Sequence, residues 1–482
     1  MVTFVASILL LLIGYFVYGR VVEQIFGIND QRPTPAYANQ DGFDYMPMSW
    51  WKAILIQLLN IAGTGPIFGA VMGALYGPVA FIWIVIGCIF AGAIHDYMSG
   101  MLSLRQGGAQ FPSLVGKYLG KYARAFITLL SILLMILVAA AFTAAPAQLL
   151  SQISPLNFLT SILIVFAYFL LATVLPITKI IGKIYPLFGA ILIFMAISIG
   201  VGIFFFDYTV PNLTLTNLHP NELPIWPLLM VTISCGAISG FHSTQSPILA
   251  RTLKKESEGR KVFYGAMIGE GIIALVWAAA GMAFYNGTNG LQTALGSGGP
   301  AGVVNEISIA TLGTFGGILA VLGVMILPIT TGDTALRSSR MMLADLLRQL
   351  SNKQVLGKRS LILLVIPVAI PAFLLSLIDY SFLWRYVGWS NQVVATFMLW
   401  TGAMYLLKHQ KFHWICSIPA LFMTGVVSTY IFYAPEGFHL EYRLSMVIGT
   451  VIWAVVFIWF IYQLVKSKTA NKEKRLTNTY VG

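Results

Sequence analysis

Apolar stretches of about twenty residues follow one another along nearly the whole chain, separated by short polar and basic connections. A helix needs roughly 17–25 such residues to cross the hydrocarbon core of a bilayer, and backbone groups inside lipid must be satisfied within the helix. The sequence therefore predicts an all-α polytopic membrane protein with about 13 transmembrane helices. The predicted spans are 2–18, 53–75, 78–104, 125–150, 158–177, 184–206, 225–249, 262–285, 304–334, 359–378, 389–407, 414–433 and 444–466.

Two of these spans contain Gly and Pro where a straight helix is expected. Ile61–Gly69 interrupts the second span, and Ser234–Pro247 interrupts the seventh. Gly and Pro free backbone N–H and C=O groups, which are tolerated at membrane depth only where protein or a cavity surrounds them. A pair of broken helices in corresponding halves points to the central binding site of a transporter.

The distribution of basic residues predicts the orientation of the chain. With the N-terminus outside and the C-terminus cytoplasmic, all of the 29 Lys and Arg residues except Arg385 and Arg443 fall on the inner side, where they are favoured. The two broken spans then cross in opposite directions, which predicts a LeuT-like five-plus-five inverted repeat. The predicted divisions are an extra N-terminal helix with a Pro-rich cytoplasmic loop (1–52), the first repeat (53–206), the second repeat (225–407), two additional helices (414–466) and a basic cytoplasmic tail (467–482).

Composition excludes the main alternatives. The chain is 58% hydrophobic and only 10% charged, whereas soluble domains carry roughly 25% charged residues. The net charge of +12 is explained by the basic inner loops, so we expect a lipid bilayer and no nucleic acid as its surroundings. The three cysteines lie in apolar spans and are interpreted as small apolar side chains.

The connection Ile28–Trp51 is polar, aromatic and rich in Pro. We interpret it as an ordered cytoplasmic loop that caps the first broken helix. A plain connector is the alternative.

Ionisable side chains inside spans are costly and are functional candidates by default. Asp96, Glu270 and Asp333 lie in the third, eighth and ninth predicted spans. Two interpretations stay open for each carboxylate. It either takes part in ion coupling, because burial lets a carboxyl group exchange a proton near neutral pH, or it pairs with a nearby basic residue and fixes helix packing. The candidate basic partners are Arg105, Arg251 and Arg337.

The broken helices supply a second kind of site. The N-terminus of a half-helix carries free N–H groups and partial positive charge, which suit a carboxylate. His242 either faces the substrate or is a buried histidine bonded to a carbonyl. We expect the substrate site to be lined by Gly63, Thr64, Gly65, Gly236, Ser239 and His242, and expect Thr330 and Thr331 to join the carboxylates in the ion-coupling set, where their hydroxyls would complete a Na⁺ site.

No enzyme motif occurs: there is no P-loop, no H-E-x-x-H and no G-x-S-x-G. We therefore expect no enzymatic activity, no metal site and no cofactor beyond a coupling ion, H⁺ or Na⁺. A secondary transporter for a small molecule is favoured. A membrane sensor or channel-like protein on the same fold is the alternative, although no selectivity-filter sequence is present.

Six stretches resemble the carbon starvation CstA family of membrane transporters, in the family's order. They are Asn29–Pro47, Ile61–Gly69, Gly92–Gly108, Cys235–His242, Tyr264–Glu270 and Thr331–Arg340. The resemblance implies a secondary transporter of the bacterial inner membrane, in the amino acid–polyamine–organocation superfamily. Members are associated with peptide uptake during carbon starvation, and some with proton-coupled pyruvate uptake.

The chain departs from this family at two points. Family members often have Gly-His-His-Phe just before the IAG motif, where this chain has Leu55-Ile56-Gln57-Leu58. A role of those histidines in proton coupling is therefore not carried over. The chain is also shorter than the longer members, and the two departures together leave pyruvate specificity open.

Overall fold

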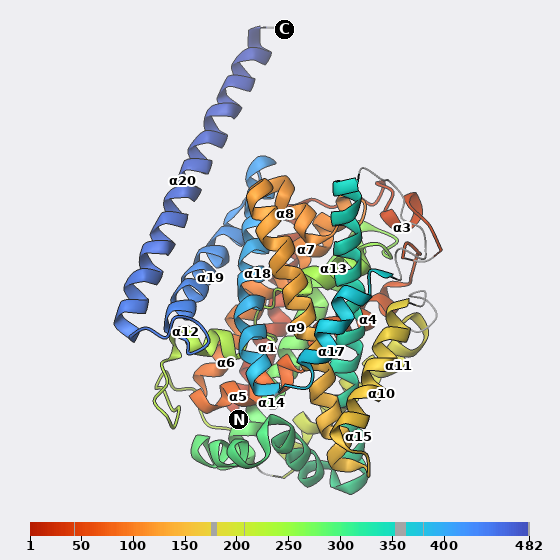
Figure 1. Cartoon of the computed structure of the whole chain (residues 1–482). Helices are drawn as coiled ribbons and strands as arrows, with labels where there is room; N and C mark the ends of the chain where they lie inside the picture. Colours follow the sequence, from red (N-terminus) through yellow and green to blue (C-terminus); the bar gives the residue numbers. More distant parts are fainter. Residues whose placement is uncertain (43, 175–180, 207, 352–362, 379, 481–482) are drawn as a thin grey trace.

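The computed structural model describes residues 1–42, 44–174, 181–206, 208–351, 363–378 and 380–480, and this part of the chain is helical, with no strand. Long helices run roughly alongside one another through a bundle (Figure 1). The helices are α1 (Val2–Ile13), α2 (Gly19–Phe26), α3 (Pro35–Ala38), α4 (Trp50–Ala62), α5 (Ala70–Gly73), α6 (Val79–Gly87), α7 (Ala93–Arg105), α8 (Phe111–Leu119), α9 (Lys121–Ile153), α10 (Phe158–Val174), α11 (Ile181–Phe205), α12 (Ile225–Thr232), α13 (His242–Ala250), α14 (Gly265–Phe284), α15 (Thr288–Ser351), α17 (Ile366–Leu375), α18 (Tyr380–Lys408), α19 (Trp414–Tyr433) and α20 (Tyr442–Tyr480).

Eight helices in the described residues are long and apolar enough to cross a bilayer, or nine when one bent pair is included. The prediction of a multi-pass helical membrane protein is therefore confirmed, while the count of thirteen stays a prediction. The shorter apolar helices Phe158–Thr173 and Ile366–Leu375 overlap two further predicted spans. Residues 175–177 and 359–362 of those predicted spans lie outside the described residues.

The bounds predicted for the ninth span were wrong. Gly299 and Gly313 interrupt α15 with φ angles of 63° and 68°, and the candidate span runs from Gly316 to Leu347 instead of over 304–334. Hydropathy alone missed this, because it averages over the residues on both sides of Gly313 and does not register the change in backbone direction there. Asp333 consequently lies near the middle of the span, whereas Glu306 belongs to the preceding segment.

Both predicted helix breaks are present. The first broken helix consists of Trp50–Ala62 and Gly65–Tyr76, which meet at an angle of 58°. At the break Gly63 has φ 50° and ψ −148°, a conformation open to Gly and strained for other residues. The second broken helix consists of α12 and α13, joined by residues 233–241, and Gly236 there has φ 82°.

The two broken helices are packed in the interior. α14 packs against α4 and α5, and α13 packs against α7 and α4. α9 lies against α15, α18 and α10. α18, α19 and α20 follow one another on one side, where α20 diverges from the bundle and extends beyond it (Figure 1).

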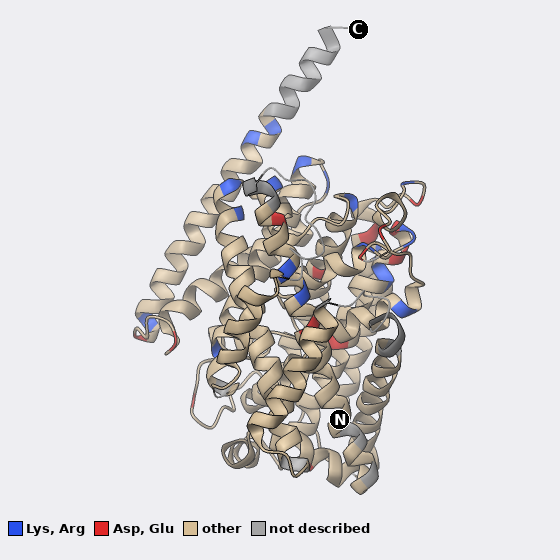
Figure 2. Ribbon diagram, turned by 45° about the vertical axis from the view of Figure 1, so that its right-hand side comes forward, with Lys and Arg blue, Asp and Glu red and all other residues tan. Residues whose placement is uncertain are grey.

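Charge is distributed unevenly between the two ends of the bundle. Figure 2 shows Lys and Arg gathered mainly toward the end from which α20 projects, whereas the N-terminus lies toward the other end. We call these the basic end and the opposite end. α13 and α18 both run toward the basic end, since Arg251 follows the last residue of α13 and Lys408 closes α18.

Candidate functional site at the two helix breaks

The two helix breaks touch each other at the centre of the bundle. Gly65 lies so close to Cys235 that a Cβ atom added to Gly65 would overlap the cysteine side chain. A Cβ on Gly69 would lie 2.9 Å from the carbonyl oxygen of Thr232. Glycine is therefore required here by close approach of the two backbones, as well as by the turn at Gly63.

A buried cluster of ionisable side chains adjoins this contact. His242 opens α13, and its Nδ1 lies 3.0 Å from Oδ2 of Asp96 on α7. His95 Nδ1 lies 2.8 Å from Oδ1 of the same carboxylate. His242 Nε2 faces Glu270 Oε2 at 3.5 Å, and all four side chains are fully buried. We call Asp96, His95, His242 and Glu270 the polar centre.

The polar centre also holds the second break in place. Glu270 Oε1 accepts a hydrogen bond of 3.2 Å from the backbone N–H of Gly236. Inside a low-dielectric interior an unpaired N–H would be costly, so this bond stabilises the irregular backbone. The carboxylate on α14 therefore has one oxygen bound to the break and one directed at His242.

One of the two alternatives for Asp96 and Glu270, pairing with a nearby arginine, was wrong. Arg105 binds Glu256 instead, at 2.9 Å, and Arg251 donates to the carbonyl oxygen of Gly108. Both arginines lie toward the basic end, too far along their helices to reach the centre. The carboxylates instead contact histidines: Asp96 lies against His95 and His242, and Glu270 faces His242.

Ser239 and two residues that sequence reasoning missed form a polar wall beside the second break. The thiol of Cys235 lies 3.3 Å from Ser239 Oγ. Asn391 on α18 donates to Ser239 Oγ at 2.7 Å and accepts from the N–H of Phe241 at 2.7 Å. Cys235 was interpreted as an apolar side chain, and the only signal for Asn391 was its polarity within an apolar helix.

Asp333, Thr330 and Thr331 gather at the first break. Tyr185 of α11 donates a hydrogen bond to Asp333 Oδ2. Thr331 and Thr330 donate to the carbonyl oxygen of Leu59, at 3.0 and 3.4 Å, one turn before the helix breaks. The structure thus divides the predicted ion-coupling residues into two groups: Asp96 and Glu270 in the polar centre, and these three between α15 and α4.

A cavity of 210 Å³ leads toward the breaks from the opposite end. Thr232, Tyr380, Trp384 and Arg385 are among the residues that line it. Tyr380 separates this cavity from the first break, because its hydroxyl lies 2.9 Å from Thr64 Oγ1. The rings of Tyr380 and Trp384 stack on each other, as do those of Trp384 and Phe142, so an aromatic layer closes the site on this side.

Ion pairs close the basic end. Asp44 lies 3.5 Å from Arg337, 3.9 Å from Arg340 and 4.0 Å from Arg251, and the ring of Tyr45 covers the Arg251 guanidinium.

These contacts belong to the connection between residues 28 and 51, of which residue 43 lies outside the described residues. Its described residues contact the α13–α14 connection and α15, and Ser49 is the N-cap residue of α4, so a cap on the first broken helix stays a prediction. The backbone N–H of Met48 donates to the carbonyl oxygen of Thr252 at 2.9 Å, and Arg32 pairs with Glu256.

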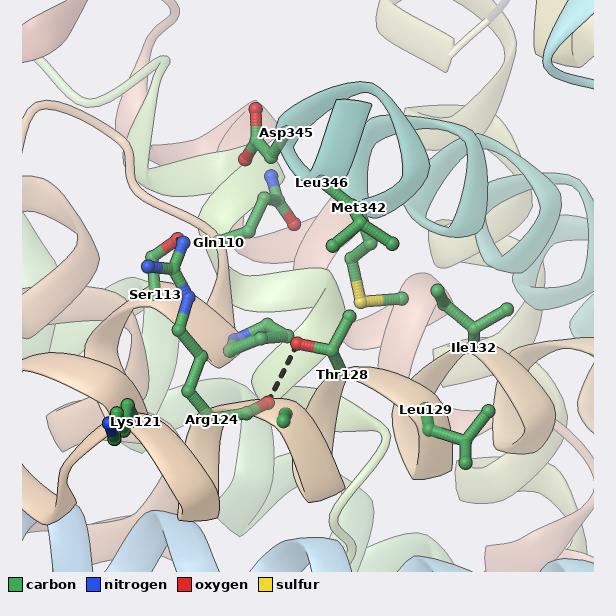
Figure 3. Close-up of a pocket in the computed structure, with 12 residues that line it drawn as sticks. Gln110, Ser113, Lys121, Arg124, Thr128, Leu129, Ile132, Met342, Asp345 and Leu346 are labelled. Carbon is green, nitrogen blue, oxygen red and sulfur yellow. Dashed lines mark hydrogen bonds between the residues drawn. The ribbon is translucent and has the colours of Figure 1, made fainter. Parts of the chain in front are cut away.

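A second cavity, of 310 Å³, lies between α8, α9 and α15 (Figure 3). Lys121, Arg124 and Asp345 line it together with apolar side chains. It does not include any of the predicted site residues. The helix breaks, with the polar centre beside them, are therefore the candidate site.

A bundle of membrane helices with two interrupted helices meeting at a buried polar centre defines a multi-pass membrane protein organised around a central site. The family described as carbon starvation protein CstA matches residues 1–200, 149–289 and 283–430, and the chain belongs to this family.

Three relatives carry three different descriptions. An uncharacterized membrane protein of Haemophilus influenzae is 49% identical over 352 residues, with 62% of this chain and 95% of the relative covered. The peptide transporter CstA of Bacillus subtilis is 28% identical, with 57% of each chain covered. The pyruvate/proton symporter BtsT of Escherichia coli is 24% identical, with 56% of this chain and 48% of the relative covered. The chain thus spans about half the length of these two named transporters.

Solved structures share the fold at low sequence identity. A manganese transporter of Eremococcus coleocola has a TM-score of 0.53 and 12% identity, with 89% of this chain and 99% of that chain covered. A Na⁺-coupled sialic acid symporter has a TM-score of 0.50 and 14% identity, with 92% and 96% covered. At this identity the likeness establishes the fold alone.

Proposed function

We propose that the protein is a secondary active transporter that imports peptides or small carboxylates, such as pyruvate, across the bacterial inner membrane by coupling to a cation. The observation that carries the proposal is the contact between two interrupted helices beside a fully buried cluster of two carboxylates and two histidines. Ionisable groups buried within the membrane are energetically costly and therefore rare, and where they occur they usually mark an ion or substrate pathway or a proton relay. Relatives named as peptide transporters and as a pyruvate/proton symporter support the same class.

The coupling ion in this proposal is a proton held between His242 and Glu270. Asp96 accepts from Nδ1 of His242, which leaves Nε2 facing Glu270 Oε2 at 3.5 Å. One proton between these two atoms would convert an unfavourable close contact into a hydrogen bond. Because Glu270 also binds Gly236 N–H, gain or loss of that proton would change the strength of the hydrogen bond that stabilises the second break.

The substrate in this proposal lies between the breaks. Gly63, Thr64 and Gly65 form one side, and Gly236 and Ser239 form the other. Arg385, in the cavity at the opposite end, would attract a carboxylate, and free N–H groups at the start of a half-helix would bind it. Asp333 with the two threonines forms a second candidate ion position, which suits Na⁺ if the coupling ion is not a proton.

The proposal includes the remaining predictions about architecture. The chain would have thirteen spans in a LeuT-like five-plus-five inverted repeat, with the N-terminus outside and the C-terminus cytoplasmic. Aligned breaks in spans of opposite direction support the repeat, and the gathering of Lys and Arg at the end from which α20 projects supports the orientation.

Uptake into proteoliposomes tests the function. Labelled dipeptide and labelled pyruvate would be offered under an imposed proton gradient and then under a sodium gradient. We expect accumulation under one gradient and its loss in Glu270→Gln, while Glu306→Gln keeps full uptake. Glu306 is the matched control, because it is an exposed carboxylate bonded to Tyr285 and distant in the fold from the breaks. No uptake of either substrate by the folded protein would refute the substrate class.

A sensor or channel-like protein on the same fold is the alternative. Counterflow separates it from a carrier, because only a carrier exchanges labelled for unlabelled substrate without a gradient. Equal substrate flux with and without internal substrate would favour a channel.

A further inference from the structure

Three potential metal-ligand atoms converge at the second helix break. Among the described residues, Cys235, His242 and Glu270 each offer one such atom, and these atoms lie within 4.8 Å of one another. Ligand atoms of one tetrahedral Zn²⁺ ion, each bound at about 2.0–2.3 Å, lie roughly 3.3–3.8 Å apart. Side-chain movements of about 1 Å would therefore bring all three onto one ion.

Two of the three atoms lack a hydrogen-bond partner. His242 Nε2 and Glu270 Oε2 are buried and unpartnered, and they face each other at 3.5 Å. A buried polar atom without a partner is costly and calls for an explanation such as an ion. Both residues lie beside Cys235, since one ligand atom from each of the three residues lies within 4.8 Å of the others.

The surroundings are those of metal-binding side chains. A metal-bound histidine usually donates its other ring N–H to a carboxylate, which fixes the ring and its tautomer. Asp96 holds Nδ1 of His242 in this way at 3.0 Å. Glu270 is fixed through its other oxygen by Gly236 N–H, and Cys235 is approached by Ser239. Each ligand is therefore oriented by a second contact.

We propose that Cys235, His242 and Glu270 form a binding site for a divalent transition-metal ion of the Zn²⁺ or Co²⁺ type. A thiolate, an imidazole and a carboxylate together suit such ions, while Mg²⁺ and Ca²⁺ prefer oxygen ligands alone. Three protein ligands leave one position of a tetrahedral ion open. The three ligands lie at the second break, where Gly65 closely approaches Cys235.

The site goes beyond the proposed transport of peptides or carboxylates and does not depend on it. If the proposed function holds, a bound ion takes the space assigned to the proton between His242 and Glu270, and it excludes that proton. The ion would then hold the second break in one conformation, because all three ligands lie on or against the break.

Cobalt spectroscopy on the purified full-length protein in nanodiscs tests the proposal. After treatment with a chelator, Co²⁺ is titrated in, and two absorption features are followed: the thiolate-to-cobalt charge-transfer band and the d–d bands of tetrahedral Co²⁺. We expect both to saturate at one ion per chain. Cys235→Ser should abolish the charge-transfer band, whereas Cys416→Ser, which removes a buried cysteine on α19, should leave it unchanged.

Asp96→Asn tests the orienting role and keeps all three ligands. We expect Co²⁺ affinity to fall about 10–100-fold, as is usual when the carboxylate behind a metal-bound histidine is altered. Because a variant in the polar centre can unfold, each is also compared with the parent by thermal unfolding with and without Zn²⁺. Saturating Zn²⁺ should raise the melting temperature of the parent and of Cys416→Ser, and should not raise that of Cys235→Ser.

Two outcomes would overturn the site. One is the absence of a saturable charge-transfer band in the folded parent, and the other is the same band in Cys235→Ser. Since neither measurement involves transport, failure of the metal site leaves the proposed function untouched, and failure of uptake leaves the metal site untouched.

Discussion

Replacing Asp44 with Asn should open the basic end of the protein. One carboxylate there lies 3.5–4.0 Å from three guanidinium groups, and its side chain is 18% exposed. Two unit charges about 4 Å apart interact by about 4 kcal/mol at an effective dielectric constant of 20. Desolvation and the repulsion among the three arginines offset much of this attraction.

We expect a net loss of about 2 kcal/mol, between the values for exposed and for buried ion pairs. If the ion pairs form only while the basic end is closed, that loss raises the ratio of open to closed molecules roughly 30-fold. Asp44→Glu keeps the charge and should return the ratio most of the way to the parent value.

The assay is the rate at which a cysteine placed at Thr252 reacts with a membrane-impermeant maleimide. Thr252 is buried under the loop, and its carbonyl oxygen accepts a hydrogen bond from Met48 N–H. With Thr252→Cys in the background, Asp44→Asn should increase the labelling rate by about the same 30-fold factor, up to the rate in denaturant. An unchanged rate in Asp44→Asn would show that these ion pairs do not hold the end closed.

Three further predictions concern the breaks and the opposite end. Gly65→Ala should lower stability by about 1–3 kcal/mol in thermal unfolding, because the added methyl group overlaps a neighbour, whereas Gly296→Ala, with open space around it, should change nothing; equal effects would contradict the close approach. Asp333→Asn should abolish gradient-driven accumulation and keep counterflow, and unchanged accumulation would remove Asp333 from coupling. Trp384→Ala should weaken the aromatic layer by part of the roughly 3–5 kcal/mol typical of a buried Trp deletion. Molecules open at the opposite end then become more common at the expense of those open at the basic end, so labelling at Thr252 should slow. A faster labelling rate would contradict this prediction.

The helix breaks could be predicted from the sequence because the information is local. A Gly-rich interruption in an apolar stretch is visible in the residues themselves, and the structure places Gly63 and Gly236 at positive φ angles. Bounds were less predictable at a kink such as Gly313, where the backbone changes direction inside a stretch over which hydropathy is averaged. Hydropathy measures composition, and it does not register a single change in backbone direction.

The partners of the buried carboxylates could not be predicted, because they are remote in sequence. Asp96 and His242 are 146 positions apart and come from α7 and α13, whereas proximity in the sequence favours the nearest arginine as the partner. Tyr185 and Asn391 were missed for a related reason: one polar residue in an apolar helix gives no sign of the face on which it lies. Position along the chain decided the outcome, since Arg105 and Arg251 bind Glu256 and the carbonyl oxygen of Gly108 toward the basic end, while His95 and His242 lie against Asp96 in the polar centre.

The two ends of the site are closed by contacts of different physical kinds. At the basic end the barrier is electrostatic, because Asp44 binds three arginines. At the opposite end it is a stack of aromatic rings held by one hydrogen bond to Thr64. A barrier of charges weakens with salt and with charge removal, whereas an aromatic barrier weakens with loss of packing. Because the barriers respond to different changes, the proposed transport function predicts that a substitution at one end weakens that barrier and leaves the other intact.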